Sequence, residues 1–425
     1  MIVVSLIGFA YLSIGVIQRI VFKPETCPIK INDNISCGEE SLLFGYQPKN
    51  KDHGIKAYGD QDYQKASEFF KVSWEIEDRD PETLIYWNNA KLNTNTNIKP
   101  YTIAVGIPIT GSQNKGKELL RGIAQAQDYI NNSETRINNR PLRILIADDH
   151  NDVAHAKRRA NQIASQSGII AVVGHYTSEV SLEALEVYQE NGIVMVSPGS
   201  ASEDFTKFCL QKKHEKKPCF FFRIIANNNH AATYFADLLF DKLDNNGLEK
   251  TAGVVYSHPS NYSNSFKTVI EKRVGEKGEF INLEQNDLST PSFDAGQIID
   301  EAQENQVNAI FIVPDGGTTI YALPNAIDLI KSNNGRLWIG GATTLYNPET
   351  LKGLSNESES SLSKFIAYSD WHRLEGCEGT PEREAFCQQA SKLWNTTQIN
   401  WRTATGYDAI MTIAKALETL PSPDR

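Results

Sequence analysis

The sequence contains no long run of lysine and arginine that could form a basic face. Its 425 residues carry 42 basic and 52 acidic side chains, which gives a formal net charge of −10 at pH 7. The densest basic patch, QKKHEKK at 211–217, is interpreted as a solvated loop. Proteins that bind nucleic acid usually present a basic face, so the composition argues against nucleic acid as a partner.

The sequence also lacks a CxxC motif, which argues against a zinc ribbon or a dithiol redox centre. Its six cysteines form three local pairs with ten-residue spacing and none left over: Cys27 and Cys37, Cys209 and Cys219, Cys377 and Cys387. We predict three sequential disulfides, with chance spacing of buried thiols as the alternative. Disulfides form in oxidising compartments, so the body of the protein is expected outside the cytoplasm.

No Ser/His/Asp or Cys/His arrangement has the context of a catalytic site, and paired cysteines cannot act as nucleophiles. His150, Asp152 and His155 share one loop, but their spacing does not place them on one helical face, so they are weak evidence for a metal site. We therefore expect that the protein is not an enzyme and needs no cofactor or metal.

Residues 1–22 form a long apolar run with one arginine. A secretory signal peptide would show a basic start and a small-residue cleavage site, and neither is present. The length reaches the roughly 20 residues that a membrane-spanning helix needs. We interpret 1–22 as an uncleaved transmembrane anchor, with a signal peptide or a buried helix as alternatives. Arg19 and Lys23 would by the positive-inside tendency place the body in the cytoplasm, so either the true start lies upstream or the tendency fails here.

Three short regions separate the anchor from the main body. Residues 23–53 are predicted to be a disulfide-containing linker, and residues 93–100 a polar linker that ends in proline. Between them, residues 54–92 carry small and aromatic residues at helical spacing, with Asp80-Pro81 starting a third helix. This segment resembles a tetratricopeptide-like helical hairpin with an extra helix. A single such unit cannot bury its apolar face alone, so it must pack on the main domain or on a partner.

From residue 101 onward, apolar β-rich runs alternate with amphipathic segments. This alternation predicts βαβ units with parallel sheets that helices cover on both faces. Residues 101–425 are too many for one sheet of ordinary size, so we expect two α/β lobes. Ligands in open α/β sheets bind outside the carboxyl ends of the strands, and two facing lobes would bury a small ligand between them. The eight runs are YTIAVGI, LRILIA, IIAVVG, IVMVS, AGVVYS, AIFIV, LWIGG and KFIAYS.

The stretch GSQNKGKE at 111–118 follows the first of these runs and resembles a phosphate-binding loop. Gly111, Gly116 and Lys117 fit its pattern, but Glu118 stands where a nucleotide-binding loop needs serine or threonine to hold Mg²⁺. We therefore interpret the stretch as a strand-to-helix turn that lines a cleft. A helix N-terminus at such a turn also suits a carboxylate ligand.

Two further strand ends carry small polar residues in front of a helix. Thr177 and Ser178 follow one run, and residues 199–202 follow the next. Their hydroxyls could cap the helices or contact a ligand, and the sequence alone leaves both roles open. Three strand ends of one lobe that present such residues together favour a binding site.

Several stretches closely resemble type I periplasmic substrate-binding proteins of ABC transporters, the branched-chain amino-acid-binding family. The resemblance covers roughly residues 100–420 and includes YTIAVGIPITG, RILIADDHND, SNYSNSF and the specific block AVVGHYTSEVSLEALEVYQENGIVMVSPGSAS. It implies a periplasmic-binding-protein-like type I fold with a hinge, in which lobe 1 comprises about 101–224 and 367–425 and lobe 2 about 225–366. The order of anchor, cysteine pair, helical hairpin and binding domain resembles membrane-anchored substrate-binding proteins of cyanobacteria.

The resemblance also implies the ligand-binding residues. Ser178, Gly199, Ser200 and Ala201 match positions that hold the α-carboxylate and help to hold the ammonium group of an amino acid. Tyr262 matches the second-lobe aromatic residue that closes over the ligand.

The sequence departs from the family at positions expected to contact the amino group and the side chain of the ligand. The acid expected after LWIGG falls on Ala342, the hydroxyl expected after Ser200 falls on Ala201, and no aromatic residue lies near Lys115. Asp315 is our candidate for the missing acid, and a loop carboxylate without a ligand role is the alternative. These departures argue against a standard leucine, isoleucine or valine pocket.

The implied function is that of an extracytoplasmic, membrane-tethered protein that captures an amino acid or similar small solute for an ABC permease. The alternative is the ligand-binding ectodomain of a membrane-anchored signalling receptor. A third and weaker possibility is an interaction protein whose helical hairpin docks a partner. The family continues beyond the last helix of this chain, so we expect a C-terminal truncation.

Overall fold

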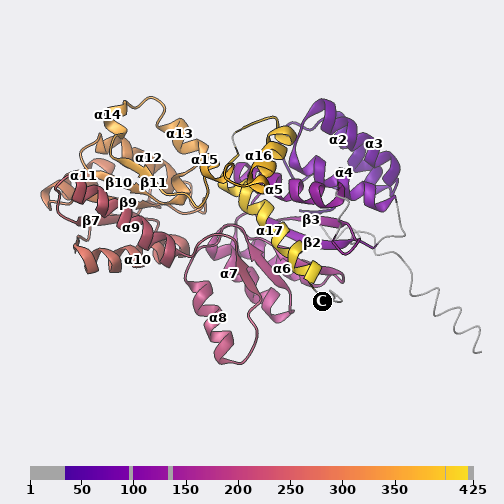
Figure 1. The fold of residues 1–425 in the computed structure, drawn as a ribbon, viewed down its shortest axis with the longest axis horizontal. Helices are drawn as coiled ribbons and strands as arrows, with labels where there is room; N and C mark the ends of the chain where they lie inside the picture. Colours follow the sequence, from indigo (N-terminus) through magenta and orange to yellow (C-terminus); the bar gives the residue numbers. More distant parts are fainter. Residues whose placement is uncertain (1–33, 95–98, 133–136, 398, 420–425) are drawn as a thin grey trace, which may run out of the picture.

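The computed structural model describes residues 34–94, 99–132, 137–397 and 399–419. Two β-sheets lie side by side, each with helices on both faces (Figure 1). Within the described ranges, no helix is both long and apolar enough to cross a bilayer. The predicted anchor at 1–22 lies outside these ranges.

The first sheet has the strand order β1-β3-β2-β4-β5-β6. Its strands are β1 (Ile35–Ser36), β2 (Tyr101–Ile107), β3 (Leu142–Asp148), β4 (Ile169–Val173), β5 (Val194–Ser197) and β6 (Phe221–Arg223). Its helices are α5 (Gln113–Asn132), α6 (Val153–Ala164), α7 (Ser178–Glu190), α8 (Asp204–His214) and α17 (Trp401–Thr419). Every residue of β2 and β3 is buried, as expected for parallel strands covered on both faces.

The second sheet has the order β11-β10-β9-β7-β8, and all its strands are parallel. Its strands are β7 (Thr251–Tyr256), β8 (Glu279–Phe280), β9 (Ala309–Val313), β10 (Trp338–Gly341) and β11 (Phe365–Ala367). Its helices are α9 (Asn228–Asn245), α10 (Asn261–Lys277), α11 (Ala295–Glu304), α12 (Ala322–Asn333), α13 (Pro348–Gly353) and α14 (Glu359–Leu362), with a 3₁₀ turn at Thr343–Leu345. All eight predicted runs lie in strands of these two sheets, which confirms the two-lobed α/β fold.

The chain passes between the lobes at residues 224–227 and again at residues 368–372. After the second crossing, α15 (Arg373–Gly376) and α16 (Pro381–Trp394) lead back to the first lobe, where α17 packs against α5. The last part of the chain therefore belongs to the lobe in which the α/β region begins.

From residue 101 onward the paired strands are parallel, as predicted; one edge strand from the preceding segment, β1, pairs antiparallel with β3. Residues 23–53 were predicted to be a linker, yet Ile35–Ser36 adds this edge strand and α2 already begins at Lys49. Beyond the short β1, the Asn89 side-chain amide donates to the Ile144 carbonyl at 2.7 Å and accepts from the Ile144 N–H at 3.2 Å. These bonds satisfy a strand edge that would otherwise be open to pairing.

The predicted helices of residues 54–92 are present as α2 (Lys49–Gly59), α3 (Tyr63–Val72), a π-helical turn (Ser73–Glu77) and α4 (Pro81–Asn93). Asp80 caps α4 by accepting from the Thr83 N–H at 2.9 Å, with Pro81 at a first-turn position. The helices lie beside β3, on the side of the first lobe away from the second lobe (Figure 1). They therefore pack on the main domain, and their tetratricopeptide-like character stays a prediction.

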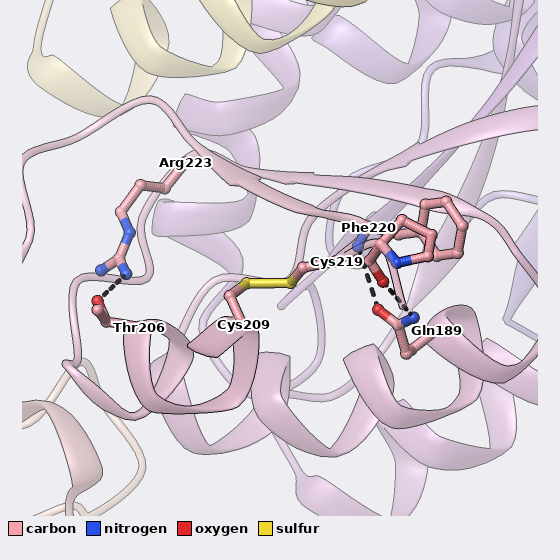
Figure 2. Close-up of a disulfide and its surroundings, with 7 residues drawn as sticks. Gln189, Thr206, Cys209, Cys219, Phe220 and Arg223 are labelled. Atoms are coloured by element: carbon pink, nitrogen blue, oxygen red, sulfur yellow. Dashed lines mark hydrogen bonds between the residues drawn. A yellow bond between two sulfur atoms is a disulfide. The ribbon is translucent and has the colours of Figure 1, made fainter. Parts of the chain in front are cut away.

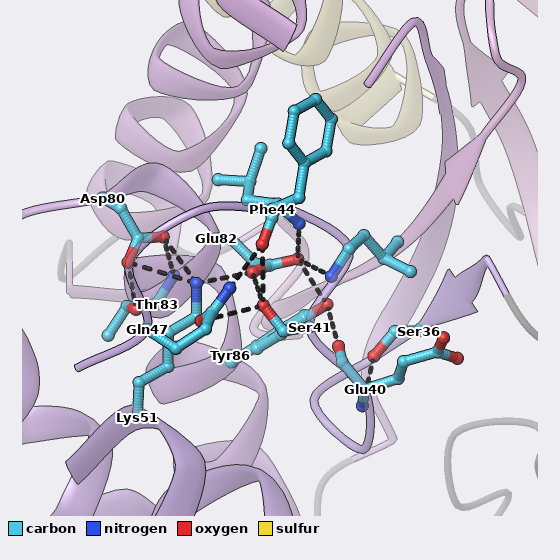
Figure 3. Close-up of polar contacts among 12 residues, drawn as sticks. Ser36, Glu40, Ser41, Phe44, Gln47, Lys51, Asp80, Glu82, Thr83 and Tyr86 are labelled. Carbon is cyan, nitrogen blue, oxygen red and sulfur yellow. Dashed lines mark hydrogen bonds and ion pairs between the residues drawn. The ribbon is translucent and has the colours of Figure 1, made fainter. Parts of the chain in front are cut away.

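A buried ionic cluster lies between these helices and the preceding segment (Figure 3). The Lys51 ammonium lies 2.6 Å from the Glu82 carboxylate and 3.3 Å from that of Asp80. Glu82 also accepts hydrogen bonds from Ser41 and Tyr86 hydroxyls and from two backbone N–H groups. The first part of the described chain is thus fixed to α2 and α4.

Two of the three predicted disulfides are confirmed. Cys209–Cys219 joins α8 to the segment before β6 (Figure 2), and Cys377–Cys387 joins the end of α15 to α16. Cys37 is disulfide-bonded as well, while its predicted partner Cys27 lies outside the described residues.

Candidate functional site

Three loops of the first lobe meet at the carboxyl ends of neighbouring strands. They are the β2–α5, β4–α7 and β5–α8 loops, and β4 lies between β2 and β5 in the sheet. As predicted, Ser178 is the first residue of α7 and Thr177 precedes it, so backbone N–H groups at a helix N-terminus face this edge.

A small cavity lies between the two lobes at this edge. The first lobe and its returning segment contribute Tyr176, Thr177, Ser178, Gly199 and Trp401; the second lobe contributes Tyr262, Gly316, Thr343 and Thr344. The cavity holds about 20 Å³, room for little more than one water molecule. A solute must therefore enter while the lobes stand further apart than in this structure.

The Thr177 and Ser178 hydroxyls connect loops of the first lobe, whereas the Ser202 hydroxyl accepts from the Asp204 N–H at 3.2 Å at the start of α8. Thr177 makes no side-chain cap bond and donates to the Asn151 amide oxygen at 2.9 Å. The Ser178 hydroxyl oxygen accepts a 3.3 Å bond from the Ser202 N–H, which joins the β4–α7 and β5–α8 loops. The loops that carry the predicted contacts are thereby held together.

The structure brings together only some of the six predicted ligand-binding residues. Ser178, Gly199 and Tyr262 line the cavity. Ser200 is buried beside it and donates to the Ser181 hydroxyl at 2.6 Å. The Ala201 carbonyl accepts from the Asn228 N–H at 2.8 Å and lies at the first crossing between the lobes. The ligand contacts of all these residues stay predictions.

Asp315 lies directly before Gly316 but turns its carboxylate to its own loop. It accepts from the Gly317 N–H at 2.7 Å and from the Thr319 hydroxyl at 2.6 Å. Asp315 does not line the cavity. Its predicted contact with an ammonium group is not tested by the structure, and its carboxylate already stabilises the β9–α12 loop.

Glu118, the residue that departs from a phosphate-binding loop, forms a buried ion pair. The Arg402 guanidinium lies 3.0 Å from the Glu118 carboxylate and donates through Nε to the Tyr176 hydroxyl at 3.0 Å. These bonds hold α5, α17 and the β4–α7 loop in one arrangement. A carboxylate engaged in this way is unsuited to a nucleotide phosphate and its Mg²⁺.

The two lobes contact each other across the cleft. The Lys115 ammonium donates to the Gly316 carbonyl at 2.9 Å, and the Asn114 amide donates to the Glu349 carboxylate at 3.2 Å. Farther along the cleft, the Glu203 N–H donates to the Ser265 hydroxyl at 2.9 Å. The structure therefore shows the lobes in a closed arrangement.

Closure leaves two ionisable groups in an environment with little water. Burial, together with the Arg402 guanidinium, lowers the pKa of Lys115 to about 8. Burial, with a contribution from the Asp315 carboxylate, raises the pKa of Glu179 to about 7. Both shifts follow from the desolvation of a charged form.

Sequence reasoning missed part of the cavity wall. Trp401 begins α17, far along the chain from the other lining residues, and no motif marked it. Thr343 and Thr344 follow Ala342, which was noted only for the acid that it lacks. The family resemblance pointed to the residues after LWIGG as a part of the site, so Thr343 and Thr344 could have been predicted from it. No local sequence pattern identified Trp401.

Comparisons with known proteins agree with this geometry. The family model for periplasmic binding protein matches residues 100–425, so the chain belongs to this family. The Leu/Ile/Val-binding protein homolog 1 of Brucella suis is 26% identical over 229 residues, which cover 51% of this chain and 56% of that protein. The chain thus spans about half the length of the curated relatives it matches.

Solved structures show the same fold. A branched-chain amino acid transporter substrate-binding protein, LivJ of Streptococcus pneumoniae in complex with isoleucine, has a TM-score of 0.60 at 19% identity, covering 76% of this chain and 86% of that chain. A solute-binding protein of an ABC transporter from R. palustris in complex with 4-hydroxybenzoate has a TM-score of 0.57 at 16% identity, covering 75% and 80%. Proteins of this fold therefore hold both an amino acid and an acid without an amino group.

Proposed function

We propose that this protein is an extracytoplasmic substrate-binding protein that captures an amino acid or similar small solute and delivers it to an ABC permease. The observation that carries the proposal is the cavity between the lobes, lined by Ser178 and Gly199 from one lobe and by Tyr262 from the other. The N-terminus of α7 and the Ser178 hydroxyl suit a ligand carboxylate. Tyr262 and Gly316 close over the ligand when the lobes come together.

The signalling ectodomain is the less favoured alternative. The relatives with this fold are described as binding proteins of transporters, which favours transport. A membrane tether in residues 1–22 would keep the protein near its permease, and this tether remains part of the proposal.

A thermal-shift screen of the full chain tests the proposed function. The N-terminal helices share their core with the first lobe, so the chain is kept whole. A ligand present at 100 times its dissociation constant stabilises the fold by about 2.7 kcal/mol. We expect a shift with one class of amino acids and none with Mg-ATP. If no amino acid shifts the melting temperature of a folded sample, an amino acid is rejected as the solute.

Replacing Ser178 with alanine is expected to weaken ligand binding by roughly 1–2 kcal/mol, the usual scale for a hydrogen bond to a charged group. Isothermal titration calorimetry measures the change. Ser165→Ala is the control, because this exposed serine at the C-terminal end of α6 does not line the cavity. Equal affinity of the wild-type protein and Ser178→Ala would remove Ser178 from the site.

Gly316→Ala is expected to oppose closure of the cleft. A Cβ atom at Gly316 would lie 2.6 Å from Thr177 Cγ2 and 3.4 Å from Tyr176 Cε1. Overpacking of this kind typically costs about 1–3 kcal/mol, and here it affects only the closed form. We expect weaker binding in calorimetry with an unchanged melting temperature of the ligand-free protein.

A second substitution checks the cause of that effect. Thr177→Ser removes the methyl group that the new Cβ would meet and keeps the hydroxyl that bonds Asn151. The double variant Gly316→Ala/Thr177→Ser should therefore regain most of the lost affinity. If the double variant regains no affinity, the effect of Gly316→Ala does not come from the clash with Thr177 but from another cause, such as a changed loop conformation.

A further inference from the structure

The wall of the cavity between the lobes carries hydroxyl, phenol and indole groups but no purely aliphatic side chain. Within the described ranges, its lining residues are all glycine, serine, threonine, tyrosine or tryptophan, with no leucine, isoleucine, valine or methionine among them. An aliphatic ligand side chain is stabilised by the apolar surface that it buries, and this wall offers it little beyond aromatic rings. The composition of the wall therefore favours a ligand side chain that forms hydrogen bonds.

Two hydroxyl groups of the wall already donate to the protein. The Thr177 hydroxyl donates to the Asn151 amide oxygen at 2.9 Å, and the Thr344 hydroxyl donates to the Pro314 carbonyl at 2.9 Å. Each hydroxyl has only one proton to donate. These two groups fix the wall and leave the donation to a ligand to other residues.

Three further polar groups of the wall have no partner. The Trp401 indole N–H, the Tyr262 hydroxyl and the Thr343 hydroxyl are buried and make no hydrogen bond within the described part of the chain. The three residues are 2%, 7% and 5% exposed. The Asp370 carboxylate lies near Thr343, but the Thr343 hydroxyl forms no hydrogen bond to it in this arrangement. Buried polar groups nearly always have partners, so three unpartnered groups around one cavity point to a ligand.

The three unpartnered groups come from different helices and turns of both lobes. Trp401 begins α17 on the first lobe, whereas Tyr262 is the second residue of α10 and Thr343 begins the 3₁₀ turn after β10. The cavity that they line holds only about 20 Å³, so they surround one small space. In an open cleft, water can satisfy them. Closure removes that water, and a ligand without an acceptor would leave these groups unsatisfied at a cost in affinity.

The chemistry of the three groups indicates what the ligand must supply. An indole N–H can only donate, and the two hydroxyls can donate as well, so the ligand must carry an acceptor. The α-carboxylate is already assigned to the N-terminus of α7 and Ser178, which leaves the acceptor to the ligand side chain. All three groups are neutral and suit a neutral oxygen, because a buried carboxylate would need a cation.

We propose that the solute is an amino acid whose uncharged side chain carries an amide or hydroxyl oxygen, and that this oxygen accepts from the Trp401 indole N–H and the Thr343 hydroxyl. The inference rests on the proposed function, because it requires an amino acid in the cleft. It makes Trp401 and Thr343 the residues that select a polar side chain over an aliphatic one of the same shape. The Tyr262 hydroxyl is a third donor to the same ligand group.

Isothermal titration calorimetry on the full chain compares amino acids of nearly the same shape with and without the oxygen. The pairs are L-asparagine with L-leucine, L-threonine with L-valine, and L-glutamine with L-homoleucine. We expect the wild-type protein to bind the polar member of one pair at least about tenfold more tightly than its apolar partner, because the apolar partner leaves buried donors unpaired. L-Aspartate and L-glutamate, which have the shapes of the two amides, should bind more weakly than the preferred polar member.

Two variants each remove one donor from the wall. Thr343→Val replaces the hydroxyl with a methyl group of similar size, and Trp401→Phe removes the indole N–H but keeps an aromatic ring. Each should weaken binding of the polar member by about tenfold and binding of the apolar member much less. Trp338→Phe is the matched control, because its indole nitrogen also lacks a partner among the described residues, whereas Trp338 begins β10 and does not line the cavity. This control should keep the preference of the wild-type protein.

The outcomes separate this inference from the proposed function. Wild-type protein that binds an apolar member as tightly as its polar partner overturns the inference and leaves solute capture intact. A thermal-shift panel in which only apolar or charged amino acids stabilise the protein has the same meaning. If Thr343→Val and Trp401→Phe both weaken the two members of a pair equally, these side chains contribute packing alone and the inference is wrong. If no amino acid shifts the melting temperature, an amino acid as the solute is rejected together with it.

Discussion

Replacing Glu82 with alanine is expected to lower the free energy of unfolding by about 3–5 kcal/mol, the usual cost of removing one partner from a buried ion pair. Glu82 is fully buried and the Lys51 ammonium is 2% exposed, so water cannot replace the lost carboxylate. Burial alone would lower the pKa of Lys51, but the charges of Glu82 and Asp80 hold it above its ordinary value. The variant leaves that cation with Asp80 alone, at 3.3 Å.

The loss extends beyond the ion pair. Glu82 accepts from the Leu42 and Leu43 N–H groups at 2.7 and 3.3 Å and from the Tyr86 hydroxyl at 3.0 Å (Figure 3). The variant leaves the two backbone N–H groups without this acceptor, and each unsatisfied group adds to the cost, whereas the Tyr86 hydroxyl keeps the Glu40 carbonyl at 2.7 Å. The segment before α2 should therefore detach from α4 before the lobes unfold.

Urea denaturation followed by tryptophan fluorescence measures this effect. Trp74 reports on the N-terminal helices, because its ring packs edge to face against Trp394 at 5.4 Å. Glu68→Ala is the control: this glutamate on α3 bonds only an exposed glutamine, so the variant should stay within about 0.5 kcal/mol of the wild-type protein. A Glu82→Ala transition that coincides with the wild-type curve would contradict the role of the cluster.

The sequence predicted the parts of the fold that depend on local patterns. Buried parallel strands read as continuous apolar runs, and cysteines ten residues apart can pair without long-range information. Strand β1 was missed because two residues carry no periodicity, and their strand character comes from an edge of β3 that lies more than 100 positions away.

The candidate site was predicted only in part, because some of its residues lie in local patterns and others come from distant parts of the chain. Ser178, Gly199 and Tyr262 lie at strand-to-helix turns, where a pattern of small polar residues and a family resemblance point to a ligand. Trp401 reaches the cavity only through the return of the chain to the first lobe. Asp315 was chosen for its place at a strand end; its carboxylate orders its own loop, and its ligand contact stays a prediction.

Gly122→Ala is expected to destabilise the protein by about 3 kcal/mol, in spite of the better helix propensity of alanine. Gly122 lies where α5 crosses α17. A Cβ atom there would lie 1.9 Å from the Thr403 carbonyl oxygen and 2.6 Å from the Tyr407 nitrogen. These are backbone atoms, so no rotation of a side chain relieves the clash. Gly406 on α17 also approaches α5 closely, with a Cβ position 2.6 Å from the Leu119 carbonyl oxygen.

The same variant should weaken ligand binding, because helix α17 carries part of the site. Trp401 lines the cavity, and Arg402 connects α17 to Glu118 and Tyr176. Moving α17 away from α5 stretches those 3.0 Å bonds and displaces the Trp401 ring. Thermal melting and calorimetry on one preparation measure both effects, with Gly275→Ala as control, since a Cβ there meets nothing within 4 Å. Lower stability with unchanged affinity would show that the site is held by the β4–α7 and β5–α8 loops alone, independently of the helix crossing.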